Sequence, residues 1–254
     1  MQTNVIKAKL KQDETVFGCF IRYPDASLVE VVSLQGWDFI VFDGEHGTLQ
    51  PRDVEHMVRA AEVHHVTPIV RVPTNQQPII LRYMDTGAQG IHVPMVNSAD
   101  DARSVVNSVK YPPLGVRGLA GIRAADYGQR MPLAEYVQHA NKETLIVIHI
   151  ETMTAIKNLP EIIKVEDIDV VFIGPTDLSS SLGKLGQLAD PVVQSAFDTI
   201  TSMTKASTMK LGVMVNNVQS AQRWQELGAD YIAIGLESLL CPAMRNYLSA
   251  VRSL

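Results

Sequence analysis

Residues Phe39-Ile-Val-Phe-Asp43-Gly-Glu-His46-Gly give the strongest indication of the fold, because an apolar run leads directly into a polar segment. Its four apolar residues are too continuous to be half exposed, which favours a strand of a parallel sheet covered on both faces. Residues 51–63 follow, with apolar side chains at helical intervals behind a first-turn proline. Strand, polar loop and helix therefore form one unit.

Short apolar runs of the same kind, bounded by turn residues, occur eight times along the chain. They are residues 16–20, 39–42, 68–72, 90–94, 145–150, 170–173, 211–215 and 231–234. Most are separated by segments of helical spacing, such as 98–109, which Asn97 or Ser98 can cap. Repeated strand and helix units over 254 residues predict an α/β fold, a single-domain (β/α)8 TIM barrel over residues 1–254. An open doubly wound sheet is the alternative, with fewer strands or an edge pair.

Composition fits a protein with a sizeable core, since 46% of residues are apolar, 19% are charged and the mean hydropathy is +0.06. The net charge of −5 gives no bulk electrostatic case for nucleic acid or an anionic membrane. The N-terminus lacks a signal-peptide pattern, and no run approaches the roughly 18 apolar residues of a spanning helix. Cys19 and Cys241 suit reduced core thiols, so we expect a cytoplasmic protein.

One connection is unusually long. Between the fourth and fifth runs the chain holds one helix and then residues 111–131, a stretch rich in Gly, Pro and Arg. Loops of that length in compact domains are usually functional or disordered. This loop before the fifth strand is therefore a candidate lid or subunit-contact arm.

Polar residues concentrate at the C-terminal strand ends, where barrels of this kind carry their chemistry. Glu151 and Asp177 follow the fifth and sixth runs, so their carboxylates can converge above the barrel. Two carboxylates with room for water and substrate oxygens are typical of a Mg²⁺ or Mn²⁺ site. The alternative is that Asp177 caps a helix starting at Leu178 and that Glu151 pairs with a basic neighbour.

Arg71 lies inside an apolar run, where an unpaired guanidinium is costly. It must meet an anion, either a bound carboxylate or enolate or a structural partner such as Asp43. His46 lies between Gly44 and Gly47, which free the backbone to place the ring over the barrel mouth. The alternative for His46 is a purely structural histidine.

Three absences narrow the chemistry. No lysine lies within the apolar runs, which argues against an imine-forming aldolase. The chain has no phosphate-binding G-x-x-x-x-G-K, no G-x-G-x-x-G after the first run and no H-E-x-x-H. An oxygen-ligated metal, an arginine and a histidine remain, a set suited to stabilising an enolate and moving a proton.

Several motifs carry a family resemblance over nearly the whole chain. They are Asp43-Gly-Glu-His-Gly, Arg71-Val-Pro, residues 81–90, residues 111–118, Ile150-Glu151 and residues 174–183. The sequence resembles the class II, metal-dependent pyruvate aldolases of the 4-hydroxy-2-oxoheptanedioate and 2-keto-3-deoxy sugar acid type, in the phosphoenolpyruvate/pyruvate barrel superfamily. The resemblance implies a carbon–carbon lyase that reversibly cleaves a 4-hydroxy-2-oxo acid to pyruvate and an aldehyde through a metal-stabilised enolate.

The resemblance also implies roles for individual residues. Glu151 and Asp177 would hold a divalent ion, Mg²⁺, Mn²⁺ or Co²⁺, which chelates the small-molecule 2-oxo acid substrate. Arg71 would neutralise the enolate oxygen. His46, oriented by Asp85, would move protons through a bound water.

Substrate binding and assembly follow from the same resemblance. Gly174, Thr176 and the amide of Asp177 would cradle the substrate carboxylate, with His149 beside them. Members of the family usually form hexamers, trimers of dimers that exchange their last helix. Residues 239–251 would be that helix here.

Two histidines depart from the commoner pattern. His149 stands where the best-known aldolases have glutamine, and His92 adds a second ring near the end of the fourth run. The plain interpretations are a hydrogen-bonding replacement at His149 and a satisfied barrel histidine at His92. One offshoot of the family is a citrate synthase of siderophore biosynthesis, which needs no metal and condenses oxaloacetate with acetyl-CoA. Extra histidines would suit that chemistry.

A third hypothesis is a catalytically silent barrel that binds a carboxylate metabolite as a regulator. Silent relatives usually lose at least one member of the polar set. All the candidate positions are occupied here, which argues against this hypothesis.

Overall fold

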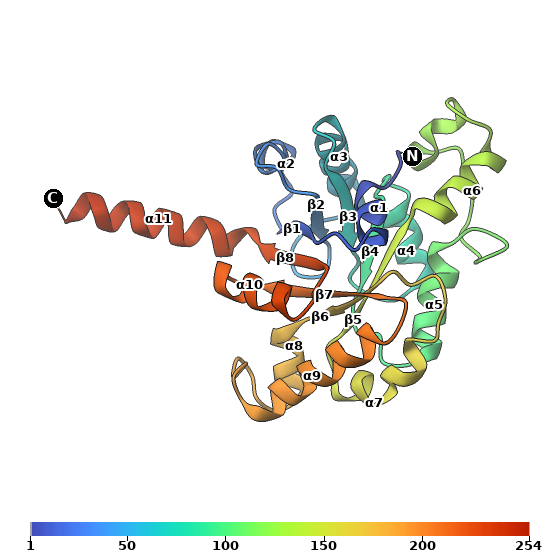
Figure 1. The fold of residues 1–254 in the computed structure, drawn as a ribbon. Coiled ribbons are helices and arrows are strands. Elements are labelled where there is room, and N and C mark those ends of the chain that lie inside the picture. Colours follow the sequence, from blue (N-terminus) through green and yellow to red (C-terminus); the bar gives the residue numbers. More distant parts are fainter. Residues whose placement is uncertain (1, 254) are drawn as a thin grey trace.

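The computed structural model describes residues 2–253, which form a closed barrel of eight parallel strands surrounded by helices (Figure 1). The strands are β1 (Val16–Ile21), β2 (Phe39–Asp43), β3 (Thr67–Arg71), β4 (Gly90–Val93), β5 (Leu145–Ile150), β6 (Val170–Ile173), β7 (Lys210–Val215) and β8 (Tyr231–Gly235). Each strand pairs with its neighbour in sequence, and β8 closes the ring on β1. The predicted single-domain (β/α)8 barrel is confirmed, and the doubly wound sheet is excluded.

The predicted strand ends differ from the observed ones by at most one residue. Runs 145–150 and 170–173 coincide with β5 and β6. One lysine does lie in a strand, because β7 begins at Lys210. Its ammonium pairs with Asp13 at the N-terminal end of the barrel, so it is turned away from the mouth.

The helices follow the strands in the expected order. They are α1 (Val5–Lys11), α2 (Ala26–Ser33), α3 (Pro51–Val63), α4 (Gln77–Met84), α5 (Ala99–Val109), α6 (Leu133–Glu143), α7 (Met153–Ile162), α8 (Pro175–Ser181), α9 (Pro191–Lys205), α10 (Val218–Glu226) and α11 (Leu236–Arg252). The predicted segment 51–63 is α3, and Ser98 caps α5 by accepting the Asp101 N–H at 3.1 Å. Within residues 2–253 no helix combines the length and the apolar character that crossing a bilayer requires.

Two apolar layers hold the barrel together. An outer layer lies between the strands and the helices, and an inner cluster fills the barrel with strand side chains such as Phe20 and Phe39. Ile6 and Leu10 of α1 join the inner cluster, so α1 covers the N-terminal end of the barrel. Burying each such side chain stabilises the fold by about 1.5–3 kcal/mol. The barrel interior is consequently closed at one end and opens at the C-terminal mouth.

The long loop has more structure than predicted. It contains a 3-10 helix at Arg123–Gly128, and α6 follows it before β5, so two α-helices rather than one separate β4 from β5. Arg117 pairs with Asp85 just after α4, and Arg123 pairs with Glu62 near the end of α3. Since helices of the barrel run back toward its N-terminal end, residues 111–131 pack away from the mouth of their own chain. They form no lid there, and the role of subunit-contact arm stays a prediction.

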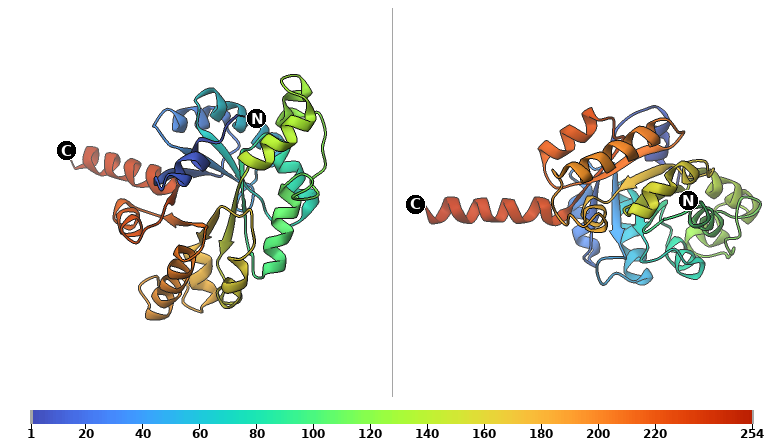
Figure 2. Two further views of the ribbon diagram at one scale, coloured as in Figure 1. Left: turned by 45° about the vertical axis from the view of Figure 1, so that its right-hand side comes forward. Right: turned by 90° about the horizontal axis from the view of Figure 1, so that it is seen from below.

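Helix α11 projects from the barrel, and the C-terminus lies at its far tip (Figures 1 and 2). Of its residues only Leu236, the first, is buried. Apolar side chains along it, including Met244 and Tyr247, are exposed. The sequence interpretation of two core thiols is half right, because Cys19 is buried in β1 whereas Cys241 is exposed on α11.

Candidate active site

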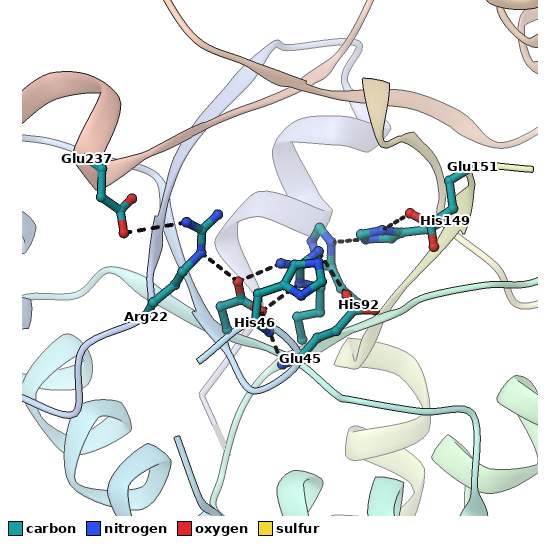
Figure 3. A network of polar contacts seen from close by, with 9 residues as sticks. Arg22, Glu45, His46, His92, His149, Glu151 and Glu237 are labelled. Carbon is teal, nitrogen blue, oxygen red and sulfur yellow. Dashed lines mark hydrogen bonds and ion pairs between the residues drawn. The ribbon is translucent and has the colours of Figure 1, made fainter. Parts of the chain in front are cut away.

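A cavity of about 190 Å³ lies at the C-terminal mouth of the barrel. Its lining brings together most of the residues singled out from the sequence: His46, Arg71, His149, Glu151, Gly174, Thr176 and Asp177. Arg22, Phe172, Pro175 and Met214 complete the lining. Figure 3 shows the polar network around this cavity, with Arg22 and His46 on one side and His149 and Glu151 on the other.

Asp43 organises the β2 side of the cavity. Its fully buried carboxylate accepts hydrogen bonds from Arg71 Nε at 2.8 Å and Nη2 at 2.5 Å, and from Arg22 Nε at 3.1 Å. The backbone N–H groups of Glu45 and His46 also donate to Asp43 Oδ1, which folds the chain after β2 into a tight turn. Burial alone would raise the pKa of Asp43, but the hydrogen bonds and charge of Arg71 outweigh it and lower the pKa.

Arg71 pairs with Asp43, the structural partner that the alternative interpretation gave it, and it also lines the cavity. Its third nitrogen, Nη1, lies 3.0 Å from Glu45 Oε2, and the guanidinium carbon lies 5.2 Å from the centre of the Phe20 ring. A guanidinium has five N–H donors, and these contacts engage three of them. Two donors are therefore left for a ligand.

Glu45 is a member of the site that the sequence reasoning did not assign. Its carboxylate faces Arg71 at the cavity edge. Burial and the charge of Glu151 raise the pKa of Glu45, although Arg71 acts in the opposite direction. Its place in the quoted Asp43-Gly-Glu-His motif was the available signal.

Glu151 directly follows β5, and each of its carboxylate oxygens has a hydrogen-bond partner. Oε1 accepts the backbone N–H of Met95 at 2.7 Å, and Oε2 lies 3.3 Å from His149 Nδ1. Burial by itself would raise the pKa of Glu151, but the hydrogen bond from His149 helps to lower it, so the carboxylate is ionised. The basic neighbour that the alternative interpretation gave to Glu151 is present as His149, although Glu151 also lines the cavity.

Asp177 lies in the first turn of α8, which begins at Pro175 with Gly174 as its N-cap residue. The alternative interpretation, in which Asp177 caps a helix starting at Leu178, is therefore wrong. Gly174 brings α8 close to β5. A Cβ atom at this position would lie 2.8 Å from Glu151 Oε2 and 3.9 Å from Asp177 Oδ2, so both carboxylates approach the same point.

This donor set fits a divalent cation. Two carboxylates from neighbouring strand ends line the same cavity. Hard cations such as Mg²⁺ often use one or two protein carboxylates and take their other ligands from substrate and water. Within residues 2–253, no group of three or more His, Cys, Asp or Glu side chains is close enough together to hold a metal ion without other ligands. The protein would thus supply two ligands and leave the others open.

His46 and Asp85 are not brought together within one chain. His46 is exposed at the mouth, whereas Asp85 follows α4 and lies toward the N-terminal end of the barrel. Its carboxylate accepts from Arg117 Nη2 at 2.9 Å. Asp85 therefore lies too far toward the other end of the barrel to orient His46 of its own chain. The sequence could not show this, because it does not reveal at which end of the barrel a helix terminus lies.

The two unusual histidines touch each other. His92 Nδ1 lies 2.9 Å from His149 Nε2, and His92 Nε2 lies 2.8 Å from the Tyr231 hydroxyl. Both plain interpretations hold, since His149 makes hydrogen bonds and His92 is satisfied at both ring nitrogens. The sequence did not predict that Tyr231 and the Met95 N–H take part in this network. The Met95 N–H reaches Glu151 from a backbone with a positive φ of +56°, for which the sequence carries no signal.

Fold and cavity together define a barrel enzyme with a carboxylate pair, an arginine and a histidine at its mouth. The chain belongs to the HpcH/HpaI aldolase/citrate lyase family, whose pattern matches residues 16–243. It is 35% identical to a 4-hydroxy-2-oxo-heptane-1,7-dioate aldolase from Escherichia coli, over 97% of this chain and 94% of that protein. It is 34% identical to a 2-keto-3-deoxy-L-rhamnonate aldolase from Escherichia coli O157:H7, over 94% and 89% of the two chains.

Solved structures agree with this assignment. An HpcH/HpaI aldolase/citrate lyase family protein from Burkholderia cenocepacia J2315 superposes with a TM-score of 0.94 at 30% identity, covering 98% of this chain and all of the other. The citrate synthase SbnG gives a TM-score of 0.88 at 28% identity, covering 97% of each chain. The predicted class, an aldolase and carbon–carbon lyase, is confirmed, and the citrate synthase is the more distant relative in sequence.

Proposed function

We propose that the protein reversibly cleaves a 4-hydroxy-2-oxo acid to pyruvate and an aldehyde with the help of a divalent cation. One observation carries the proposal: the Glu151 and Asp177 carboxylates approach one point in a cavity that Arg71 also lines. Class II aldolases as a group generally depend on a divalent metal, and the donor set at the mouth suits Mg²⁺, Mn²⁺ or Co²⁺.

Glu151 and Asp177 would hold the ion, which when bound supplies a Lewis acid for the keto oxygen of the substrate. Arg71 offers its two remaining N–H donors to the oxygen on which negative charge develops. Thr176 and the backbone N–H groups in the first turn of α8 bind the substrate carboxylate beside Gly174, with His149 as a further polar neighbour. These contacts orient the bond that breaks.

His46 is the proposed proton carrier, acting through a water at the exposed side of the cavity. The backbone N–H of His46 is held by Asp43 at 3.1 Å, which fixes the turn while leaving the ring at the mouth. Orientation of that ring by Asp85 requires a second copy of the chain, because Asp85 lies toward the other end of its own barrel. The exposed apolar side chains of α11 support the related proposal of a homo-oligomer, a hexamer built from dimers.

Chelation tests the proposal. The protein treated with EDTA should lose pyruvate release from a 4-hydroxy-2-oxo acid and regain it when Mg²⁺, Mn²⁺ or Co²⁺ is added. Turnover that is indifferent to both treatments would refute the role of the cation.

A second candidate function is citrate formation from oxaloacetate and acetyl-CoA without a metal. The similarity to the citrate synthase SbnG and the buried pair His92 and His149 favour it. Thiol release from acetyl-CoA, measured in parallel with pyruvate release and in the presence of EDTA, separates the two functions. Thiol release without pyruvate release would identify the second.

A further inference from the structure

Four side chains form a continuous hydrogen-bonded line from the cavity into the barrel. Glu151 lies at the mouth, His149 and His92 come from β5 and β4, and Tyr231 begins β8 at the N-terminal end. The successive contacts are 3.3, 2.9 and 2.8 Å long, and Figure 3 shows the part of this line from His92 to Glu151. Each side chain is at least 96% buried.

Apolar rings surround the middle of this line. The His92 ring packs edge-on against Phe20 and Phe172, with centroids 5.4 and 5.0 Å away. A nitrogen of His92 without a partner would therefore be costly. Its two neighbours in the line satisfy both of its nitrogens.

The donors in this line follow from its buried end. The Tyr231 phenol has one proton to donate, and its hydrogen-bond partner is His92 Nε2, so Tyr231 donates and Nε2 accepts. The proton of the His92 ring is then on Nδ1 and is donated to His149 Nε2, which leaves His149 to donate from Nδ1 to Glu151 Oε2. Burial lowers the pKa of His92 and raises that of Tyr231, so the ring is neutral and the phenol keeps its proton.

The opposite direction of hydrogen bonding would leave the Tyr231 hydroxyl without an acceptor. If His149 donated to His92, then His92 would donate to Tyr231, and the buried phenol proton would need another acceptor. The hydrogen bond that the structure gives this hydroxyl is the one to His92. All three protons therefore point toward the cavity.

We propose that His92 and Tyr231 are positioning residues that hold His149 as its Nδ1–H tautomer, with this proton directed at Glu151 Oε2. Free histidine in water favours the Nε2–H form, so the line imposes the less common tautomer on both rings. The effect is to fix the orientation of the Glu151 carboxylate at the mouth. The link to cation binding rests on the proposed function, whereas the tautomers do not.

The tautomers can be measured in the metal-free wild-type protein by solid-state ¹⁵N NMR after histidine labelling. The chain has seven histidines, and spectra of His149→Gln and His92→Gln variants assign the two signals. We expect Nδ1 protonated and Nε2 bare in both rings. An Nε2–H or doubly protonated His149 would overturn the inference.

Tyr231→Phe removes the hydroxyl alone and keeps a ring that stacks on Phe39, whose centroid is 4.2 Å away. The matched control is Tyr136→Phe, since Tyr136 is equally buried and its hydroxyl contacts Tyr111 outside the cavity. We expect the Tyr231 variant to shift or split both histidine signals and to weaken Mn²⁺ binding at least about 3-fold, below the roughly 10- to 100-fold typical of a ligand's direct partner. The control should change neither.

Unchanged tautomers and Mn²⁺ affinity in Tyr231→Phe would refute the positioning role. Mn²⁺ affinity is measured from the free-ion signal in electron paramagnetic resonance. If wild-type protein failed to bind Mn²⁺, the proposed cation would be wrong, and the wild-type tautomers would still decide this inference.

Discussion

Asp43 on the β2 side of the cavity and Glu151 on the β5 side are both buried carboxylates, yet the charges of their partners differ. Asp43 contacts two guanidiniums, those of Arg22 and Arg71, whereas Glu151 contacts a backbone N–H and an imidazole. The first charge is balanced inside the protein. The second is held in place by partners that include no arginine or lysine, and the Asp177 carboxylate lies nearby.

The two sides of the cavity should therefore differ in their contributions to folding and to catalysis. Breaking a buried ion pair is strongly destabilising, so the β2 side should matter for the fold as well as for turnover. On the β5 side the carboxylates would be available for a cation, and substitutions there should cost activity more than stability. Substitutions on the two sides should therefore differ in how they change stability and activity.

The largest effect is expected from Glu151→Gln, which removes the charge and keeps the shape. Pyruvate release should fall at least about 100-fold, because several kcal/mol of charge stabilisation depend on the cation. The exposed Glu161→Gln, which disturbs only a surface pair with Lys164, is the matched control and should keep full activity. Near-normal turnover of Glu151→Gln would contradict the proposal that the β5 side serves catalysis.

Arg71→Ala should lose most of the activity and also about 3 kcal/mol of unfolding free energy, because Asp43 and Glu45 lose a buried cation. Urea denaturation measures the stability and pyruvate release the activity. Mn²⁺ affinity should be retained, unlike in Glu151→Gln. If Arg71→Lys, which keeps the charge, were as unstable as the alanine variant, packing rather than charge would explain the loss.

Asp43 should make stability depend on pH in the acid range. Its pKa is lower in the folded than in the unfolded chain, so its contribution is complete above the unfolded value of about 3.9 and is lost as pH falls through the folded value. Each pKa unit of difference corresponds to about 1.4 kcal/mol. Urea midpoints from pH 5 downward should fall less steeply in Asp43→Asn than in the wild type, and parallel curves would contradict the pairing.

The smallest effect is expected at Glu45. Its pKa is higher in the folded chain, so ionisation costs stability as pH rises from the unfolded toward the folded value, and the cost persists above it. Glu45→Gln removes this cost together with one contact to Arg71, so neutral-pH stability should change by less than about 1 kcal/mol. A loss of several kcal/mol in urea denaturation would show that Glu45 belongs to the balanced charges of the β2 side.

The sequence predicted the fold well because every strand is a mostly apolar run and helical segments separate these runs along the chain. It also placed Arg71, Glu151 and Asp177 correctly at the mouth, since strand ends meet there by topology. Asp85 could not be placed in this way, because the end of α4 is directed by helix length and packing. The line from Tyr231 to Glu151 joins three strands that are far apart in sequence, and only their register in the closed barrel brings these side chains into contact.

Helix α11 has one further consequence. A helix with a single buried residue receives almost no tertiary support from its own barrel, whereas most helical stability in proteins comes from tertiary packing. Its helicity should therefore obey mass action: far-ultraviolet circular dichroism should lose signal on dilution as α11 frays, while the barrel beneath it remains folded.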